Sequence, residues 1–197
     1  MGKGHLGHRP SIITSIHSDD NGITWERGDI VCRHDDNIDG TILINPSETI
    51  PVQLEDSSVM LNIRSESEID RRLIAISPDG STNWKIRGFD NALLEPVCMA
   101  SILKSNQPSE NEFKDIIFIN PDNLENTMIP EGHNLRHDRK RLSAKLSFDD
   151  AKTWPVNKVI EEGPSGYSDV AQLRSGEFIC IYELSLIHIS EPTRPTP

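Results

Sequence analysis

The residue types that most often carry chemistry are present in this chain, but their spacing favours neither a metal site nor a redox site. Cys32, Cys98 and Cys180 form an odd and widely separated trio, which fits neither a disulfide framework nor a zinc site. The histidines show no metal-ligand spacing, and no glycine-rich phosphate loop is present. We therefore expect no metal and no cofactor.

The charged residues are abundant but unbalanced. Lys and Arg total 20 against 31 Asp and Glu, and the net charge of −11 argues against a protein that binds nucleic acid through its overall charge. Residues 136–141 are a basic run, which can indicate a nucleic-acid or import patch, but the acidic background and the lack of interleaved aromatic residues favour a solvated strand edge. No apolar run approaches the roughly 18 residues of a membrane span, and no signal peptide is recognisable on this chain.

Three eight-residue phrases that each end in tryptophan organise the chain. They occupy residues 18–25, 77–84 and 147–154, and all share Ser at the first place, Asp at the third and Trp at the eighth. The phrases start 59 and 70 residues apart. A repeat of roughly this length is typical of propellers, solenoids and arrays.

Each phrase has the composition of a tight turn that leads into a strand. Ser and Asp side chains accept hydrogen bonds from nearby amides, Gly at the fifth place permits a positive φ, and we expect each Trp to bury its ring against the adjoining strands. No helical stripe is convincing. The expected strands include 11–17, 41–45, 59–63, 72–77, 97–103, 116–120, 142–147 and 177–182. Many short strands with one marked turn per unit predict an all-β chain built as part of a β-propeller.

The phrases and the segments between them resemble the exo-α-sialidases (neuraminidases), in which such a phrase is called an Asp box or BNR repeat. The carrying segments are residues 45–49, 59–65, 71–77, 95–98, 118–121, 163–169 and 176–183. An Asp box alone is a weak signal, because non-catalytic propellers also contain it, but the ordered set is specific. The resemblance implies about three four-stranded blades of a six-bladed propeller in residues 1–183.

The C-terminal residues 184–197 do not continue this pattern. They show no strand alternation and look like a translated sequencing adapter, with a natural proline-rich tail as the alternative. We therefore expect two parts, a sialidase-like partial propeller at 1–183 and a non-native tail at 184–197.

The resemblance also implies roles for individual residues. Tyr167 matches the catalytic tyrosine of the family, and Glu48 matches the glutamate that pairs with it. Arg64 matches the second arginine of the substrate-binding triad, and Arg139 is the best match to the third. Glu183 matches the glutamate that holds the first arginine in place. Within the basic run, Arg136 or Arg141 are alternatives to Arg139.

Chemistry explains why a tyrosine would be used. Sialic acid carries a carboxylate on its anomeric carbon, which would repel a carboxylate nucleophile, and sialidases are an exception that uses tyrosine. A tyrosine has a pKa near 10 and needs a base beside it. The implied reaction is hydrolysis of terminal sialic acids with retention, in which Glu48 takes the proton of Tyr167 and arginines bind the substrate carboxylate.

The resemblance places the first arginine and the general-acid aspartate upstream of Met1, so we expect residues 1–183 by themselves to be inactive. It implies a sialylated glycan as partner, and a secreted, periplasmic or lysosomal parent protein. The alternative is a non-catalytic Asp-box propeller that binds carbohydrate or protein.

Overall fold

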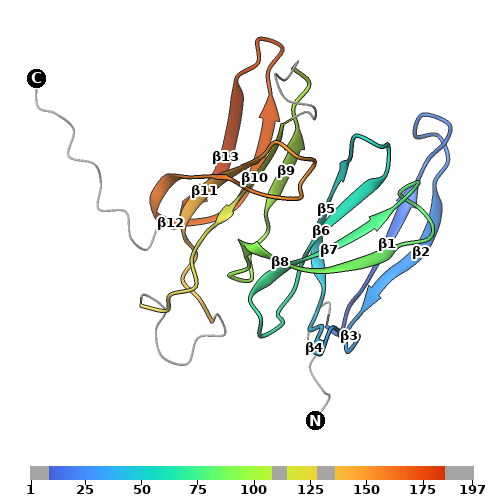
Figure 1. Ribbon diagram of the computed structural model, residues 1–197, viewed down its shortest axis with the longest axis horizontal. Coiled ribbons are helices and arrows are strands. Elements are labelled where there is room, and N and C mark those ends of the chain that lie inside the picture. Colours follow the sequence, from blue (N-terminus) through green and yellow to red (C-terminus); the bar gives the residue numbers. More distant parts are fainter. Residues whose placement is uncertain (1–8, 108–114, 128–135, 185–197) are drawn as a thin grey trace, which may run out of the picture.

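The computed structural model describes residues 9–107, 115–127 and 136–184, and within them the regular structure is all strand (Figure 1). None of these residues forms a helix that could cross a bilayer. The strands are β1 (Ile12–His17), β2 (Glu26–Arg33), β3 (Asn37–Ile38), β4 (Thr41–Ile42), β5 (Ser47–Gln53), β6 (Val59–Arg64), β7 (Arg71–Ser77), β8 (Lys85–Leu94), β9 (Ser101–Lys104), β10 (Ile116–Pro121), β11 (Lys140–Ser147), β12 (Val156–Gln172) and β13 (Phe178–Leu184).

The strands pair as antiparallel meanders. Strands β5 to β8 form one four-stranded sheet in chain order, and β9 to β13 form a second, five-stranded sheet. The pairs β1–β2 and β3–β4 complete the described part. Sequential four-stranded meanders are the units of a β-propeller. Strands β5 to β8 form one such unit and β9 to β12 form another; the pair β1–β2 precedes them, and the end of β12 paired with β13 follows them. The predicted fold class is therefore confirmed.

Strand β12 belongs to two sheets. Its first part, from Val156 to Pro164, pairs with β11, whereas its second part, from Ser165 to Gln172, pairs with β13. The second part also lies against β9, where Ser168 approaches Ser101. The inner strands β1, β5, β9 and the end of β12 therefore follow one another around the molecule, each in contact with the next.

The core lies between neighbouring sheets rather than inside any one of them. One cluster joins β2 to β6 and β7, a second joins β5 and β6 to β10, and a third joins β10 and β11 to β12. Fully buried members include Leu43, Ile63, Leu73, Ile116 and Leu142. The central strands β6, β7 and β10 are packed on both faces and are buried almost throughout.

The three boxes form the predicted turns. In the first, Asp20 accepts hydrogen bonds from the amides of Ile23 and Thr24 and from the Thr24 hydroxyl. These bonds, with one from Ser18, lower the pKa of Asp20 to about 2. Asp79 and Asp149 accept equivalent bonds in the second and third boxes.

The expected burial of every box tryptophan is wrong for the first. Trp84 and Trp154 pack against the clusters that join their sheets to the preceding one, but Trp25 is 60% exposed. The reason is the direction in which a box points. Its tryptophan faces the sheet that precedes its own, and within the described residues no sheet precedes β1–β2.

Two predicted strands are shorter than expected. The run 97–103 yields only β9, because residues 95–98 form a turn with Val97 at φ +60°. The run 41–45 yields only β4, and Asn45 has φ +43°. Leu184, assigned to the tail, pairs with Ser165 as the last residue of β13; residues 185–197 lie outside the described part.

Candidate active site

Strand ends and loops from different sheets bring the candidate residues together. Glu48 lies at the start of β5 and Arg64 is the last residue of β6, where it pairs with Ser47. Tyr167 lies in the second part of β12, just after that strand changes partners. Arg139 immediately precedes β11. The antiparallel pairing of β5 with β6 explains why the first two side chains are neighbours.

Glu48, Arg64 and Tyr167 form a closed set of hydrogen bonds. The Tyr167 hydroxyl donates to Glu48 Oε1, and Arg64 Nη1 donates to Glu48 Oε2. Arg64 Nη1 also donates to the Tyr167 hydroxyl at 3.1 Å. A phenol, a carboxylate and a guanidinium thus meet in one contact, although Tyr167 is 119 residues from Glu48 in the chain.

Arg139 completes this group from the ring face of the tyrosine. Its guanidinium carbon lies 5.4 Å from the centroid of the Tyr167 ring, within the range of a cation–π contact. Its Nη2 donates to the carbonyl of Val97 at 2.6 Å. By contrast, Arg136 pairs with Asp70, and Arg141 is exposed. Of the three arginines considered, Arg139 is the one in contact with Tyr167.

Glu183 lies on the backbone side of the tyrosine. Its Oε2 accepts a hydrogen bond from the Tyr167 amide at 3.2 Å, and the side chain itself is exposed. A Cβ on Gly166 would lie 2.7 Å from the same oxygen. Because residue 166 is glycine, Glu183 has room to accept the hydrogen bond from the Tyr167 amide.

The charges fix the resting protonation of the pair. Burial raises the pKa of Glu48, but hydrogen bonds from Tyr167 and Arg64, and the charges of Arg64 and Arg139, outweigh it and bring the pKa below its ordinary value. Burial and the hydrogen bond to Glu48 raise the pKa of Tyr167, and Arg64 offsets this only in part. The group at rest is therefore a neutral phenol beside a carboxylate.

Both arginines keep an unused donor. Arg64 is 7% exposed, and the Nε atoms of Arg64 and Arg139 are buried without a hydrogen-bond partner among the described residues. A buried donor without a partner costs roughly 1–3 kcal/mol. Guanidinium groups beside an ionisable pair are suited to binding a carboxylate.

Residues 5–180 match the family model described as the BNR repeat-like domain. The chain belongs to this family. It is 28% identical over 172 residues to a sialidase of Micromonospora viridifaciens, and the matched segment covers 86% of this chain and 23% of the relative. It is 29% identical over 185 residues to a sialidase of Vibrio cholerae, with 87% of this chain and 22% of the relative covered.

Solved structures agree on the fold of this BNR repeat-like chain. The Hadza microbial sialidase Hz136 superposes with a TM-score of 0.58 at 26% identity, over 79% of this chain and 26% of its own. The NanB sialidase of Streptococcus pneumoniae superposes with a TM-score of 0.66 at 18% identity, over 88% and 24%. The chain spans about a quarter of the length of these relatives. The predicted resemblance to sialidases with Asp boxes is confirmed.

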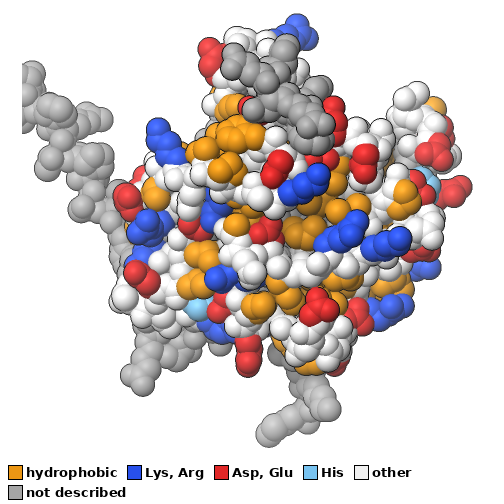
Figure 2. Space-filling view, in the orientation of Figure 1, with side chains coloured by type: hydrophobic (Ala, Val, Ile, Leu, Met, Phe, Trp, Pro, Cys, Tyr) orange, Lys and Arg blue, Asp and Glu red, His pale blue; other side chains and the backbone are white. Residues whose placement is uncertain are grey.

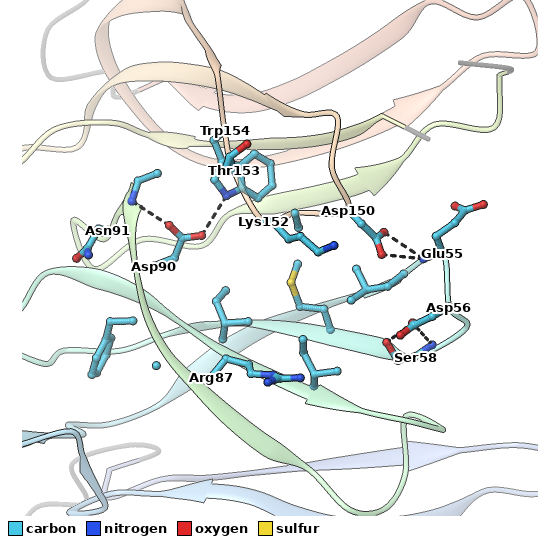
Figure 3. Close-up of a pocket in the computed structure, with 18 residues that line it drawn as sticks. Glu55, Asp56, Ser58, Arg87, Asp90, Asn91, Asp150, Lys152, Thr153 and Trp154 are labelled. Atoms are coloured by element: carbon cyan, nitrogen blue, oxygen red, sulfur yellow. Dashed lines mark hydrogen bonds between the residues drawn. The ribbon is translucent and has the colours of Figure 1, made fainter. Parts of the chain in front are cut away.

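A separate groove of the BNR repeat-like chain lies away from these residues. It has a volume of about 860 Å³ and separates the β5–β8 sheet from the third box (Figure 3). Two contacts bridge it: Trp154 Nε1 donates to Asp90 at 3.0 Å, and Asp150 accepts from the Glu55 amide at 3.1 Å. Figure 2 shows apolar side chains gathered among charged ones on the face of the molecule that Figure 1 presents. The groove thus lies between two sheets, and residues of the third box bind across it to the β5–β8 sheet.

Sequence reasoning missed one buried feature beside the site. Arg72 and Glu95 form an ion pair with both side chains fully buried, next to the turn that contains Val97. The segment 95–98 carried the family resemblance but was given no role. The available signal was Arg72 itself, a charged residue inside the apolar run that forms β7.

Proposed function

We propose that this chain supplies part of the active site of an exo-α-sialidase, which hydrolyses terminal sialic acids from glycoconjugates with retention. The observation that carries the proposal is the Tyr167 hydroxyl bound at once to Glu48 and Arg64. Similarity to curated sialidases over most of the chain supports it.

In this proposal Tyr167 is the nucleophile and Glu48 is its base. The phenol oxygen bonds to the anomeric carbon as the glycosidic bond breaks, and the phenol proton passes to Glu48. Since the pKa of Glu48 is lowered and that of Tyr167 is raised, a free phenolate is unfavourable before substrate arrives. The proton therefore moves as the new bond forms, which is the timing of general-base catalysis.

The second half of the reaction reverses these roles. Water attacks the anomeric carbon as the bond to Tyr167 breaks, the proton that water loses goes to the conjugate base of the acid that protonated the departing alcohol, and the phenol oxygen takes its proton back from Glu48. Two inversions give net retention. The departing alcohol needs a proton from an acid, and no described residue is assigned that role. We accordingly propose that residues 1–183 alone do not turn over substrate.

Arg64 and Arg139 are proposed to bind the carboxylate of the substrate. Both guanidinium groups lie beside Tyr167, and each charge-assisted hydrogen bond to a carboxylate contributes about 1.5–3 kcal/mol. The net charge of −11 would repel an anionic sugar, so local arginines must overcome it.

The test is Tyr167→Phe in a polypeptide that contains these residues and hydrolyses a fluorogenic sialoside. Turnover should fall on the order of 10³-fold or more, as expected for loss of a nucleophile. Tyr182→Phe is the matched control, because Tyr182 is the other tyrosine of the chain and bonds Glu161 rather than Glu48. Unchanged turnover in Tyr167→Phe would remove the nucleophile assignment. Sialoside binding without any wild-type turnover would instead favour a non-catalytic carbohydrate-binding propeller.

A further inference from the structure

Arg72 and Glu95 form a buried ion pair beside the turn 95–98, and this turn contacts Arg139 of the candidate site. Arg72 on β7 and Glu95 are both fully buried. Arg72 Nε donates to Asn62 Oδ1 at 2.5 Å, and Arg72 Nη1 donates to the carbonyl of Cys98 at 3.1 Å. Desolvating two charges is costly, so a buried pair is weak evidence for stability by itself. Its contacts indicate a different purpose.

The pair holds both polar groups of Cys98. Glu95 Oε1 accepts a hydrogen bond from the Cys98 amide at 2.8 Å, while Arg72 binds the Cys98 carbonyl. Between Glu95 and Cys98 lies Val97, a β-branched residue at φ +60°. Such a backbone conformation is costly for valine and persists only where the surroundings impose it. Here the ion pair binds the backbone on the C-terminal side of Val97.

The strained turn is in direct contact with the candidate site. The carbonyl of Val97 accepts the hydrogen bond from Arg139 Nη2 at 2.6 Å. Arg139 in turn lies over the ring of Tyr167. The Val97 carbonyl and the Cys98 amide belong to one peptide group. That group is bound by Glu95 on one side and by Arg139 on the other, and Arg72 binds the next carbonyl along the chain.

We infer that Arg72 and Glu95 are positioning residues that hold Arg139 over Tyr167 by fixing the Val97 carbonyl. Neither touches the tyrosine or an incoming anion; they act through the turn 95–98. The consequence for catalysis rests on the proposed function, whereas the position of Arg139 does not.

A titration tests the position without requiring turnover. The charge of Arg139 contributes to the lowered pKa of Glu48, so displacing Arg139 should raise that pKa. We expect a rise in Glu95→Gln, measured by carboxyl-carbon NMR with the signal assigned through Glu48→Gln. Loss of the negative charge of Glu95 alone would act in the opposite direction. A fall, or no change, would overturn the inference.

Two further variants separate positioning from general damage. Asp90→Ala removes the hydrogen bond between β8 and Trp154, which lies in the turn between β11 and β12. This variant should leave the pKa of Glu48 unchanged. Arg72→Lys keeps the buried charges but loses the fork that binds Asn62 and Cys98, and should raise the pKa of Glu48 even if Glu95→Gln fails to fold. If the pKa of Glu48 rose equally in Asp90→Ala, the rise would reflect a general loss of stability, and the inference would be overturned.

Activity supplies the second readout. In a polypeptide that hydrolyses the sialoside, Glu95→Gln should lower kcat/KM on the order of 10²-fold, the cost of a misplaced binding group. The acid limb of its pH profile should move to higher pH, and that of Asp90→Ala should not. A wild type without turnover would defeat the proposed function and leave the titration to decide the positioning.

Discussion

The phenol of Tyr167 donates a hydrogen bond to the carboxylate of Glu48, and the two residues belong to strands of different sheets. The same phenol oxygen accepts a hydrogen bond from Arg64 at 3.1 Å. One oxygen therefore faces a proton acceptor that raises its pKa and a cation that lowers it. Together with burial, these two neighbours set the pKa of the tyrosine.

The first prediction concerns the ionisation of Tyr167. Because burial and Glu48 raise its pKa and Arg64 opposes them, Glu48→Gln should lower the pKa of Tyr167, and Arg64→Met should raise it further. Near-ultraviolet absorbance in a Tyr182→Phe background isolates the signal, since the chain has two tyrosines. Equal pKa values in the two variants would contradict the assigned contacts.

The second prediction concerns stability against pH. A carboxyl with a lowered pKa stabilises the fold above its unfolded pKa of about 4.3, and this contribution disappears as the pH falls through the folded pKa. Glu48→Gln should therefore lower the free energy of unfolding at pH 7, by about 1–3 kcal/mol. Urea unfolding at neutral and acidic pH should show the difference from wild type narrowing below about pH 4. A constant difference would show that the charge of Glu48 is not involved.

The third prediction compares two tryptophans at the same place in their boxes. Trp154 donates to Asp90 across the groove, whereas Trp25 is exposed and its indole nitrogen bonds Gly22 of its own turn. Trp154→Phe should reduce the unfolding free energy by about 1 kcal/mol or more. Trp25→Phe should change it by less than about 0.5 kcal/mol. Urea titrations of both variants provide the measurement, and a reversed order would contradict the inter-sheet role.

The fourth prediction concerns the contact between β2 and the second box. A Cβ on Gly28 would collide with the backbone carbonyl of Ser81, which also accepts a hydrogen bond from the Asp29 amide at 2.7 Å. Gly28→Ala should therefore loosen β1–β2 from the β5–β8 sheet. Hydrogen exchange should accelerate at the β1–β2 amides and remain slow at β6 and β7. Uniform protection across these strands would contradict the prediction.

Local patterns predict much of this fold. The boxes specify their own turns, because Ser and Asp bind amides within a few residues, and the apolar runs 59–63, 72–77 and 116–120 lie in central strands. Strands β2, β5, β8 and β12 lie outside the predicted runs. Gly163 and Pro164 normally end a strand, but here they mark the point where β12 exchanges β11 for β13.

The candidate site shows a similar division. Family resemblance selected Tyr167, Glu48, Arg64 and Arg139, and the structure brings these four side chains together. Resemblance gave no reason for Arg139 to lie over the ring. That reason is the carbonyl of Val97, 42 residues away in the chain, and a backbone conformation that no local sequence pattern signals.

The exchange of partners along β12 has a mechanical consequence. Tyr167 follows the exchange point by a few residues, and its acceptor Glu48 is anchored on β5. If the two sheets rock against each other, the phenol and the carboxylate must move apart, because each is carried by a different sheet. If Tyr167 passes its proton to Glu48 as proposed, that transfer requires the two sheets to keep their relative tilt.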